Sequence, residues 1–205
     1  MLVAVCALVA LLLVPVMGGR FGRLANVRLQ WLWLVPLALG LQILVISVVP
    51  TADARVLAAV HVGTYGLAGV FIWRNRVVPG LVVLGAGAAA NGVTIALNGG
   101  VLPASADALQ RSGFQVDPGE FTNSGVLPDP VLPWLGDVLW VPAGWPLANV
   151  FSVGDVLIVA GFAWLVHSTC GSAVAGLSAV RRGRHAAGSP RPQPEQPAEP
   201  RLQQA

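Results

Sequence analysis

The chain has 205 residues, of which 55% are hydrophobic and only 10% are charged. A soluble globular domain carries about 25% charged residues because its surface must be wetted, so this composition excludes an ordinary soluble fold. All twelve basic residues are arginine, and they form no continuous basic stripe. The net charge of +3 therefore does not indicate nucleic-acid binding.

Long stretches without any charged residue recur along the chain, and each approaches the roughly 20 residues that a helix needs to cross a bilayer. The first stretch has no basic residue before its apolar run, which is the reverse of the charge order in a secretory signal. We therefore predict an all-α membrane protein with five transmembrane helices, at about residues 2–18, 31–50, 56–73, 77–97 and 152–172.

The arginines predict the orientation of these helices. If the five spans alternate, ten of the twelve arginines fall on one side of the membrane. Cytoplasmic loops are enriched in basic residues. We therefore expect a multi-pass protein of the bacterial cytoplasmic membrane, with its N-terminus outside and its C-terminus in the cytoplasm.

A long segment, residues 98–151, lies outside the membrane in this topology, and it contains seven prolines and five acidic residues. Its second half, 131–150, alternates apolar residues with tryptophan and proline. We interpret it as a short interfacial or re-entrant segment. A sixth span is the alternative, which Asp137 and three prolines disfavour. Residues 1–182 then form the transmembrane domain, and the Pro- and Gln-rich residues 183–205 form a disordered cytoplasmic tail.

Polar residues inside apolar spans are functional candidates, because hydrocarbon offers them no hydrogen-bonding partner. In the predicted topology they gather near the outer ends of the helices, beneath the long segment. Asn91 and Asn98 lie seven residues apart and so share one helix face. The candidate outer-face cluster comprises Gln42, His61, Asn91, Asn98, Gly99, Gly100, Asp137, Ser152 and Asp155.

Several of these residues have a purely structural explanation. Ser152 and Asp155 match the capping-box pattern at a helix start, which we favour over a functional acid. Gln42 and Asn91 can join neighbouring helices by hydrogen bonds, and a lone His61 is more often a packing residue than a proton carrier. The small residues of 77–97 favour close packing within the molecule, and an oligomer interface is the second interpretation.

No motif for catalysis, phosphate binding or metal binding is present, so we expect no cofactor and no metal. Cys6 and Cys170 lie at opposite faces of the membrane in the predicted topology. They are therefore too far apart for a disulfide bond.

Five sequence elements carry a resemblance to a known family. They are Gly18-Gly19-Arg20 after the first span, Gln42 within the second, the Asn98-Gly-Gly-Val-Leu-Pro103 turn, Leu135-Gly136-Asp137 and the segment 149–155. Together they resemble domain-of-unknown-function family 5317, a family of bacterial membrane proteins, over about residues 1–170. This resemblance implies a small polytopic inner-membrane protein and no particular activity. It also implies that residues 98–103, Asp137 and residues 152–155 belong together.

The sequence favours a non-enzymatic binding or accessory membrane component over two alternatives. In the favoured hypothesis, Asp137 and Asp155 accept hydrogen bonds from the backbone of the turn 98–100. Its partners are the lipid bilayer and a membrane protein or a second copy of the chain, with no nucleic acid. The alternatives are a small-solute transporter or channel-like subunit acting as an oligomer, and an envelope or lipid-modifying enzyme.

Overall fold

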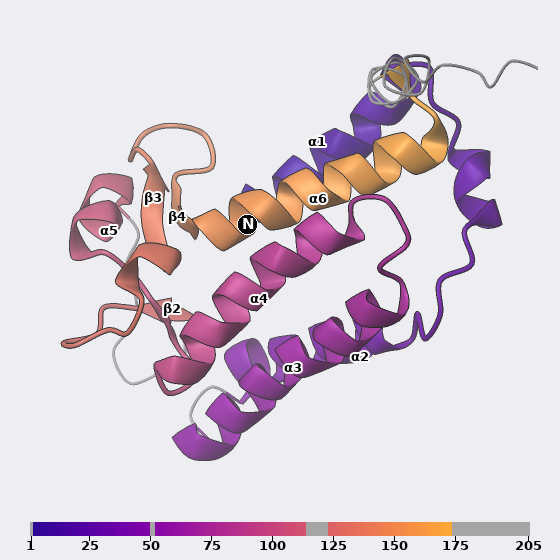
Figure 1. Cartoon of the computed structure of the whole chain (residues 1–205). Coiled ribbons are helices and arrows are strands. Elements are labelled where there is room, and N and C mark those ends of the chain that lie inside the picture. The colour runs from indigo at the N-terminus through magenta and orange to yellow at the C-terminus, as the bar shows by residue number, and fades with distance from the viewer. Residues whose placement is uncertain (1, 50–51, 114–122, 174–205) are drawn as a thin grey trace, which may run out of the picture.

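Five apolar helices make up most of the structure (Figure 1). The structure is a computed structural model, and it describes residues 2–49, 52–113 and 123–173. The five helices coincide with the five stretches predicted to be spans, within four residues at either end. The helices are α1 (Leu2–Val16), α2 (Leu34–Ile43) with its π-helical continuation η2 (Leu44–Val48), α3 (Ala54–Arg74), α4 (Leu81–Leu97) and α6 (Val153–Cys170).

Two of these helices, α3 and α6, are long and apolar enough to cross a membrane. The helix α1, the continuous pair α2–η2 and the helix α4 are shorter. At 1.5 Å per residue, the 15 residues of α1 extend about 22 Å, against a hydrocarbon core of about 30 Å.

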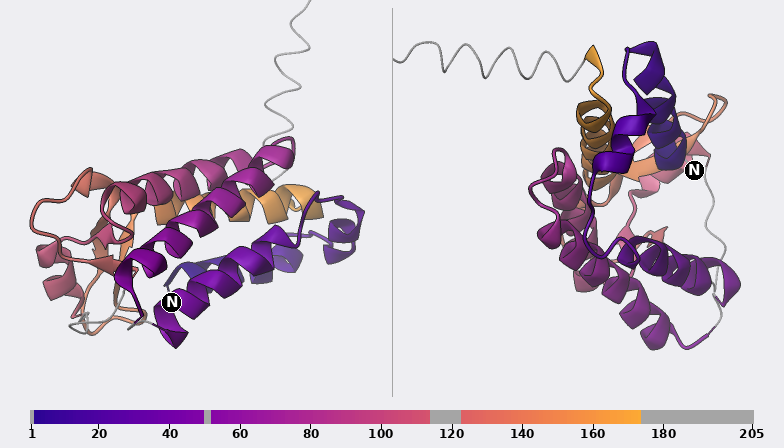
Figure 2. Two further views of the ribbon diagram at one scale, coloured as in Figure 1. Left: turned by 90° about the horizontal axis from the view of Figure 1, so that it is seen from below. Right: turned by 90° about the vertical axis from the view of Figure 1, so that its right-hand side faces the viewer.

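The helices follow one another round an open arc in the order α1, α6, α4, α3, α2 (Figure 2). This order differs from the chain order, because α1 packs mainly against α6 at the far end of the sequence. Their contact is a cluster formed by Val14, Val166 and Cys170, all of them buried. A second cluster of Leu34, Phe71 and Leu81 joins α2, α3 and α4.

Matched glycines allow α4 and α6 to approach closely. Gly80, the N-cap of α4, and Gly87 within α4 face Gly161 and Gly154 on α6, with the same seven-residue spacing in both segments. A methyl group on Gly87 would lie 2.8 Å from the backbone nitrogen of Ile158, and one on Gly154 would lie 2.8 Å from the Gly87 carbonyl oxygen. Such close approach through small residues is characteristic of helix pairs in membranes. The small residues of α4 thus serve packing within the molecule.

The prediction of an all-α protein is wrong for the segment between α4 and α6. Four short strands and two short helical elements cap the ends of α4 and α6 (Figure 1, left). The first two strands pair in parallel and the last two antiparallel. These elements are β1 (Leu102–Pro103), α5 (Ala106–Ser112), β2 (Ser124–Gly125), η3 (Pro133–Leu135), β3 (Asp137–Val141) and β4 (Asn149–Ser152).

The stretch 131–150 forms η3, β3 and the start of β4, so it is not a sixth transmembrane helix. Its prolines interrupt helical hydrogen bonding, while Val138, Trp140 and Val141 favour an extended strand. Strands β3 and β4 pair in a register that places Asp137 opposite Ser152. The hairpin therefore delivers the chain directly to the start of α6.

At the opposite end, a short 3₁₀ helix, η1 (Phe21–Asn26), connects α1 to the segment before α2. The buried side chain of Asn75 holds that segment against α3. Its Oδ1 accepts from the Gln30 backbone nitrogen at 2.7 Å, and its Nδ2 donates to the Gln30 and Phe71 carbonyl oxygens.

The helix α6 ends at Cys170, followed by Gly171 at a positive φ of 67°. This left-handed residue closes the helix within two residues of the predicted end of the span. The predicted tail, residues 183–205, lies outside the described residues. Both cysteines are free, as predicted.

Candidate functional site

The most complete polar group at the capped end joins α4 to α6. The Ser152 hydroxyl accepts from the Asp155 backbone nitrogen at 3.0 Å, and Asp155 Oδ2 accepts from the Ser152 nitrogen at 3.1 Å. This confirms the predicted capping box. Asn91 closes the group, because its Nδ2 donates to Asp155 Oδ1 and its Oδ1 accepts from the Ser152 hydroxyl, both at 2.9 Å.

Burial makes this triad structurally important. Ser152 is 0% exposed and Asn91 is 3% exposed, so their polar atoms depend on one another for hydrogen bonds. Both carboxylate oxygens of Asp155 are also engaged. The triad therefore fixes the start of α6 against α4, and Asp155 acts there as a helix cap.

A second polar group links α2, α3 and the turn that follows α4. His61 is fully buried, and its Nδ1 lies 2.8 Å from the Gly100 carbonyl oxygen, so that ring nitrogen donates. One turn along α3, Thr64 donates to the His61 carbonyl oxygen at 2.6 Å and accepts from Gln42 Nε2 at 2.9 Å. The ring of Tyr65 meets the His61 ring edge-on, with centroids 5.7 Å apart.

Asn98 attaches the capping segment to the end of α4. Its Oδ1 accepts from the Val131 backbone nitrogen, and its Nδ2 donates to the Val131 carbonyl oxygen, both at 2.8 Å. The same Nδ2 donates to the Thr94 carbonyl oxygen at 2.7 Å. Gly99 follows with a φ of 68°, and its Cα faces open space.

Asp137 is the least satisfied of the predicted site residues. Its side chain is 5% exposed, and within the described residues its Oδ1 has no hydrogen-bond partner. Burial raises the pKa of this carboxyl to about 6; the charge of Asp155 adds to the rise, and a hydrogen bond with Ser124 opposes it. Asp137 therefore titrates close to neutral pH.

The structure does not bring together all nine predicted residues in one site. Asn91, Ser152 and Asp155 form one group, with Asp137 beside Ser152 in the hairpin. Gln42, His61 and Gly100 belong to the second group. The predicted hydrogen bonds from Asp137 and Asp155 to the turn 98–100 are wrong. Asp155 accepts from the Ser152 nitrogen and from Asn91, and Asp137 lies opposite Ser152 in the hairpin. The turn is bound by His61 instead.

An apolar cavity of about 410 Å³ lies inside the arc, between α2, α3, α4 and α6. Pockets of about 300–1,000 Å³ commonly hold small molecules. The wall consists of aliphatic and phenylalanine side chains, apart from Gln42, Thr64 and Tyr65. Gln42 and Thr64 already bond to each other, so the wall offers a ligand mainly dispersion contacts.

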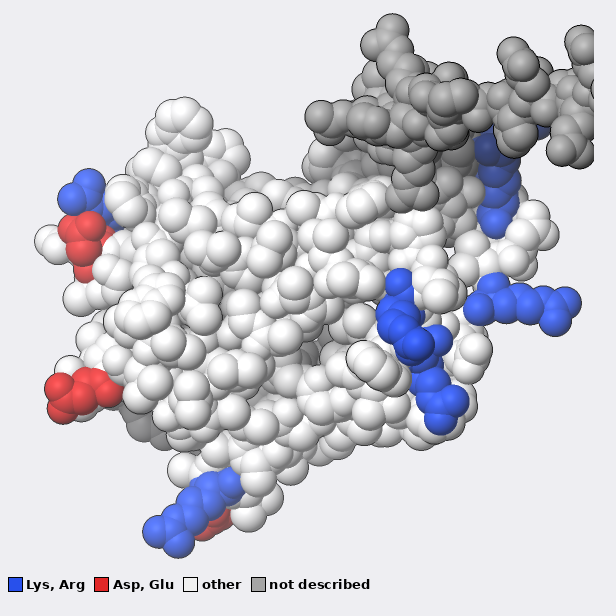
Figure 3. Space-filling model, in the orientation of Figure 1, with Lys and Arg blue, Asp and Glu red and all other residues white. Residues whose placement is uncertain are grey.

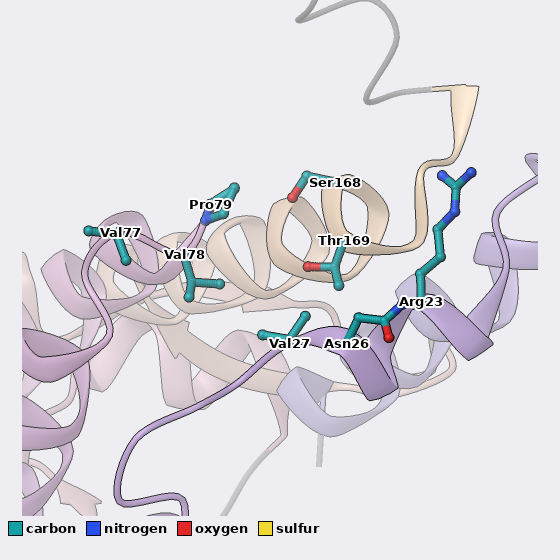
Figure 4. Close-up of a pocket in the computed structure, with 8 residues that line it drawn as sticks. All are labelled: Arg23, Asn26, Val27, Val77, Val78, Pro79, Ser168 and Thr169. Carbon is teal, nitrogen blue, oxygen red and sulfur yellow. The ribbon is translucent and has the colours of Figure 1, made fainter.

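A second pocket, of about 510 Å³, opens at the end where η1 lies, between η1, the connection of α3 to α4, and α6 (Figure 4). The Arg23 side chain extends from η1 toward the end of α6, where its guanidinium contacts Gly171. The arginine thus packs against the protein. The lining that remains is mostly valine and proline, with Asn26, Ser168 and Thr169.

Sequence reasoning missed Asn75, which is 2% exposed and holds the segment before α2 in place. A polar residue at a helix end between Arg74 and Arg76 resembles an ordinary surface position, so no local signal distinguished it. The glycine pairing of α4 with α6 was missed as well, although the equal seven-residue spacing in the two segments was a usable signal.

Within the described residues, no group of three or more histidine, cysteine, aspartate or glutamate side chains is placed to hold a metal ion.

The chain matches a protein of Thermotoga maritima described as uncharacterized, with 33% identity over 91 residues. That match covers 44% of this chain and 52% of the relative, so the chain spans about half of the relative's length. No solved structure matches the chain.

A family profile matches residues 26–167, which contain four of the five elements on which the resemblance rests. The first element, Gly18-Gly19-Arg20, precedes the matched region together with α1. The match covers well over half of the chain and includes both polar groups and the apolar cavity. The chain therefore belongs to DUF5317, a family of unknown function.

Proposed function

We propose that the chain is a five-span protein of the bacterial cytoplasmic membrane that binds an apolar molecule between its helices without transforming it. The apolar surface supports the membrane location, because large side chains such as Leu12, Val16, Ile43 and Val82 are more than half exposed. Figure 3 shows this uncharged surface as a broad band between the charged ends of the molecule.

The arrangement of charges supports an orientation with the N-terminus outside. Among the described residues, five arginines lie at the end that contains η1, with no acidic residue beside them. The acidic residues lie at the capped end, mostly in the segment between α4 and α6 (Figure 3). The positive-inside rule assigns the arginine end to the cytoplasm.

The short helices α1, α2–η2 and α4 are compatible with five spans. A helix shorter than the bilayer is accommodated by local thinning and by flanking polar side chains. Trp31 and Trp73 each lie beneath a guanidinium, of Arg74 at 4.4 Å and of Arg76 at 4.6 Å. Such aromatic and basic pairs suit the interface between hydrocarbon and water.

The apolar cavity is the observation that carries the binding role. It has the volume of a ligand site, and its lining contains no acid, histidine, cysteine or serine. Its hydroxyl groups belong to Tyr65 and Thr64, and that of Thr64 is bonded to Gln42 and to the His61 carbonyl oxygen. Catalysis requires a nucleophile, a general acid or base, or an electrophile within reach of the substrate. The polar groups outside the cavity, such as Asn91 with Asp155, are engaged in holding helix ends. A binding or accessory component fits these features best.

A second copy of the chain is the candidate protein partner. A groove of about 300 Å³ on the other side of α3 and α4 is lined by small residues, including Gly66, Gly69, Ala89 and Ala96. Small residues let an apposed membrane helix approach closely. This groove, rather than the glycines that face α6, would form an oligomer interface.

The binding role is tested by filling the cavity. Ala68 lines it from α3, and Ala68→Phe would occupy part of its volume. We expect this variant, purified in detergent, to lose the binding of an apolar fluorescent dye that the original chain binds. Ala59→Phe is the matched control, since Ala59 is exposed on the same helix. Equal dye binding by both variants and the original chain would contradict the proposal.

A further inference from the structure

One end of the apolar cavity is formed by the segment that precedes α2. Leu29 and Leu32 line the cavity there, opposite Leu165 of α6. The segment is not free to move away, because its Gln30 backbone makes two hydrogen bonds with the buried Asn75 side chain, at 2.7 and 2.9 Å. The cavity therefore has a fixed end on the side of the molecule where the arginines gather.

Two arginines lie next to this end. Arg28 directly precedes Leu29 in the segment. Arg74, at the end of α3, lies over the ring of Trp31, which follows Leu29 by two residues. Both side chains are exposed, and neither forms an ion pair within the described residues. The described acidic residues belong to elements at the opposite, capped end, and the acidic side chains visible in Figure 3 (red) lie on that side. Two arginines without an ion-pair partner among the described residues thus flank the segment that forms this end of the cavity.

We propose that the molecule bound in the cavity is an anionic phospholipid, with one acyl chain between the helices and its phosphate at Arg28 and Arg74. This inference rests on the proposed function, because it takes the helices to lie in a bilayer. The apolar wall suits an acyl chain, and the two guanidinium groups favour an anionic headgroup over a zwitterionic one. The arginines would then select among lipids.

Other occupants fit these features less well. A helix of a second copy could place an apolar side chain in the cavity, but an apolar helix carries no negative charge to complement the two arginines. The residues after 183 are polar and proline-rich and carry three arginines against two glutamates, so their net charge is positive and they match neither the apolar wall nor Arg28 and Arg74. An anionic lipid satisfies both the apolar wall and the charge.

The test measures lipid binding to the full chain in a neutral detergent by native mass spectrometry. Dioleoyl phosphatidylglycerol is compared with dioleoyl phosphatidylcholine, which has the same acyl chains and no net charge. The double variant Arg28→Gln/Arg74→Gln should bind phosphatidylglycerol about 25-fold more weakly, at about fivefold for each arginine, with unchanged phosphatidylcholine binding. Arg55→Gln is the control, since Arg55 is an exposed arginine at the start of α3, at the other end of the molecule.

Each outcome has a distinct meaning when Ala68→Phe is measured beside these variants. Loss of both lipids in Ala68→Phe, with loss of phosphatidylglycerol preference in the double variant, is the expected result. Loss in Ala68→Phe with an unchanged preference in the double variant overturns the anionic-lipid inference and leaves the proposed function standing. Unchanged lipid binding in Ala68→Phe overturns both the anionic-lipid inference and the proposed function. If the original chain is a dimer and Ala68→Phe dissociates it, a second copy of the chain, and not a lipid, occupies the cavity. Thermal midpoints of all variants show whether each one is folded.

Discussion

The triad of Asn91, Ser152 and Asp155 shows how much depends on single side chains in this protein. An acid at the first turn of a helix stabilises it through the backbone nitrogens and the helix dipole. Here the same acid also satisfies the buried amide of Asn91. Losing it would remove the cap and leave a buried donor without its partner, and the second effect is the larger one.

We therefore expect Asp155→Ala to lower the stability of the detergent-solubilised protein by about 2–4 kcal/mol, the sum of a capping loss and an unsatisfied buried amide. Thermal unfolding followed by circular dichroism measures it. Asp107→Ala should change little, because the Asp107–Arg111 ion pair is exposed. If Ser152→Ala and Asp155→Ala act through one triad, their effects are less than additive in the double variant. Full additivity would contradict the shared role.

Asp137 predicts a specific pH dependence. The pKa of its carboxyl is raised from 3.8 to about 6 in the folded protein, so the folded state holds the proton more tightly than the unfolded chain. Stability from this group is present below about pH 4 and is lost as the pH rises to about 6, in total roughly 3 kcal/mol. Asp137→Asn removes the titration. We expect this variant to exceed the original chain in thermal midpoint at pH 7.5 and to match it near pH 3, where the carboxyl is protonated in both states. An equal difference at both pH values would show that Asp137 is not the titrating group.

At the scale of elements, the pairing of α4 with α6 organises the fold. The two helices meet through glycines, and their polar triad lies at one end of that contact. In the proposed membrane location, dispersion contacts at short distance between the two helices would replace the hydrophobic driving force available in water. Close approach of the backbones is therefore the main source of stability for this pair.

Substituting a glycine at this contact should be costly even when the new side chain is small. Gly87→Ala places a methyl group against the Gly154 carbonyl oxygen and the Ile158 nitrogen, which are backbone atoms and cannot rotate away. We expect a loss of about 1–3 kcal/mol, measured as a lower thermal midpoint. Gly63→Ala is the matched control on α3, because its new methyl group meets no atom within 4 Å. It should retain or gain up to ~1 kcal/mol through helix propensity. Similar effects of the two substitutions would contradict the tight contact.

For the molecule as a whole, sequence patterns of short range predicted the structure well. The apolar stretches marked the five helices, and Ser152 with Asp155 marked a capping box four residues long. The features that sequence reasoning missed depend on distant partners. Asn91 and Asp155 are 64 residues apart, and the strand character of Asp137–Val141 depends on pairing with β4. The composition of the proline-rich stretch 131–150 does not indicate the strand with which part of it pairs.

The proposed topology is tested in intact cells by labelling single cysteines in a chain that lacks Cys6 and Cys170. We expect a membrane-impermeant maleimide to label Ala143→Cys, in the exposed turn between β3 and β4, without permeabilisation. Asn26→Cys and Arg76→Cys, at the arginine end, should react only after the membrane is opened. Labelling of all three positions from outside would contradict the five-span orientation.

The position of α1 has a consequence for how the protein is assembled during synthesis. This helix is made first, yet the helix against which it mainly packs, α6, is made last. Its buried contact, Val14 with Val166 and Cys170, cannot form until nearly all of the described chain has left the ribosome. In the proposed five-span topology, α1 would be held by lipid or by the insertion machinery while α2, α3 and α4 enter the membrane. Nascent chains arrested before Val153 should therefore leave α1 exposed to cross-linking with that machinery, and chains extended beyond Cys170 should release it.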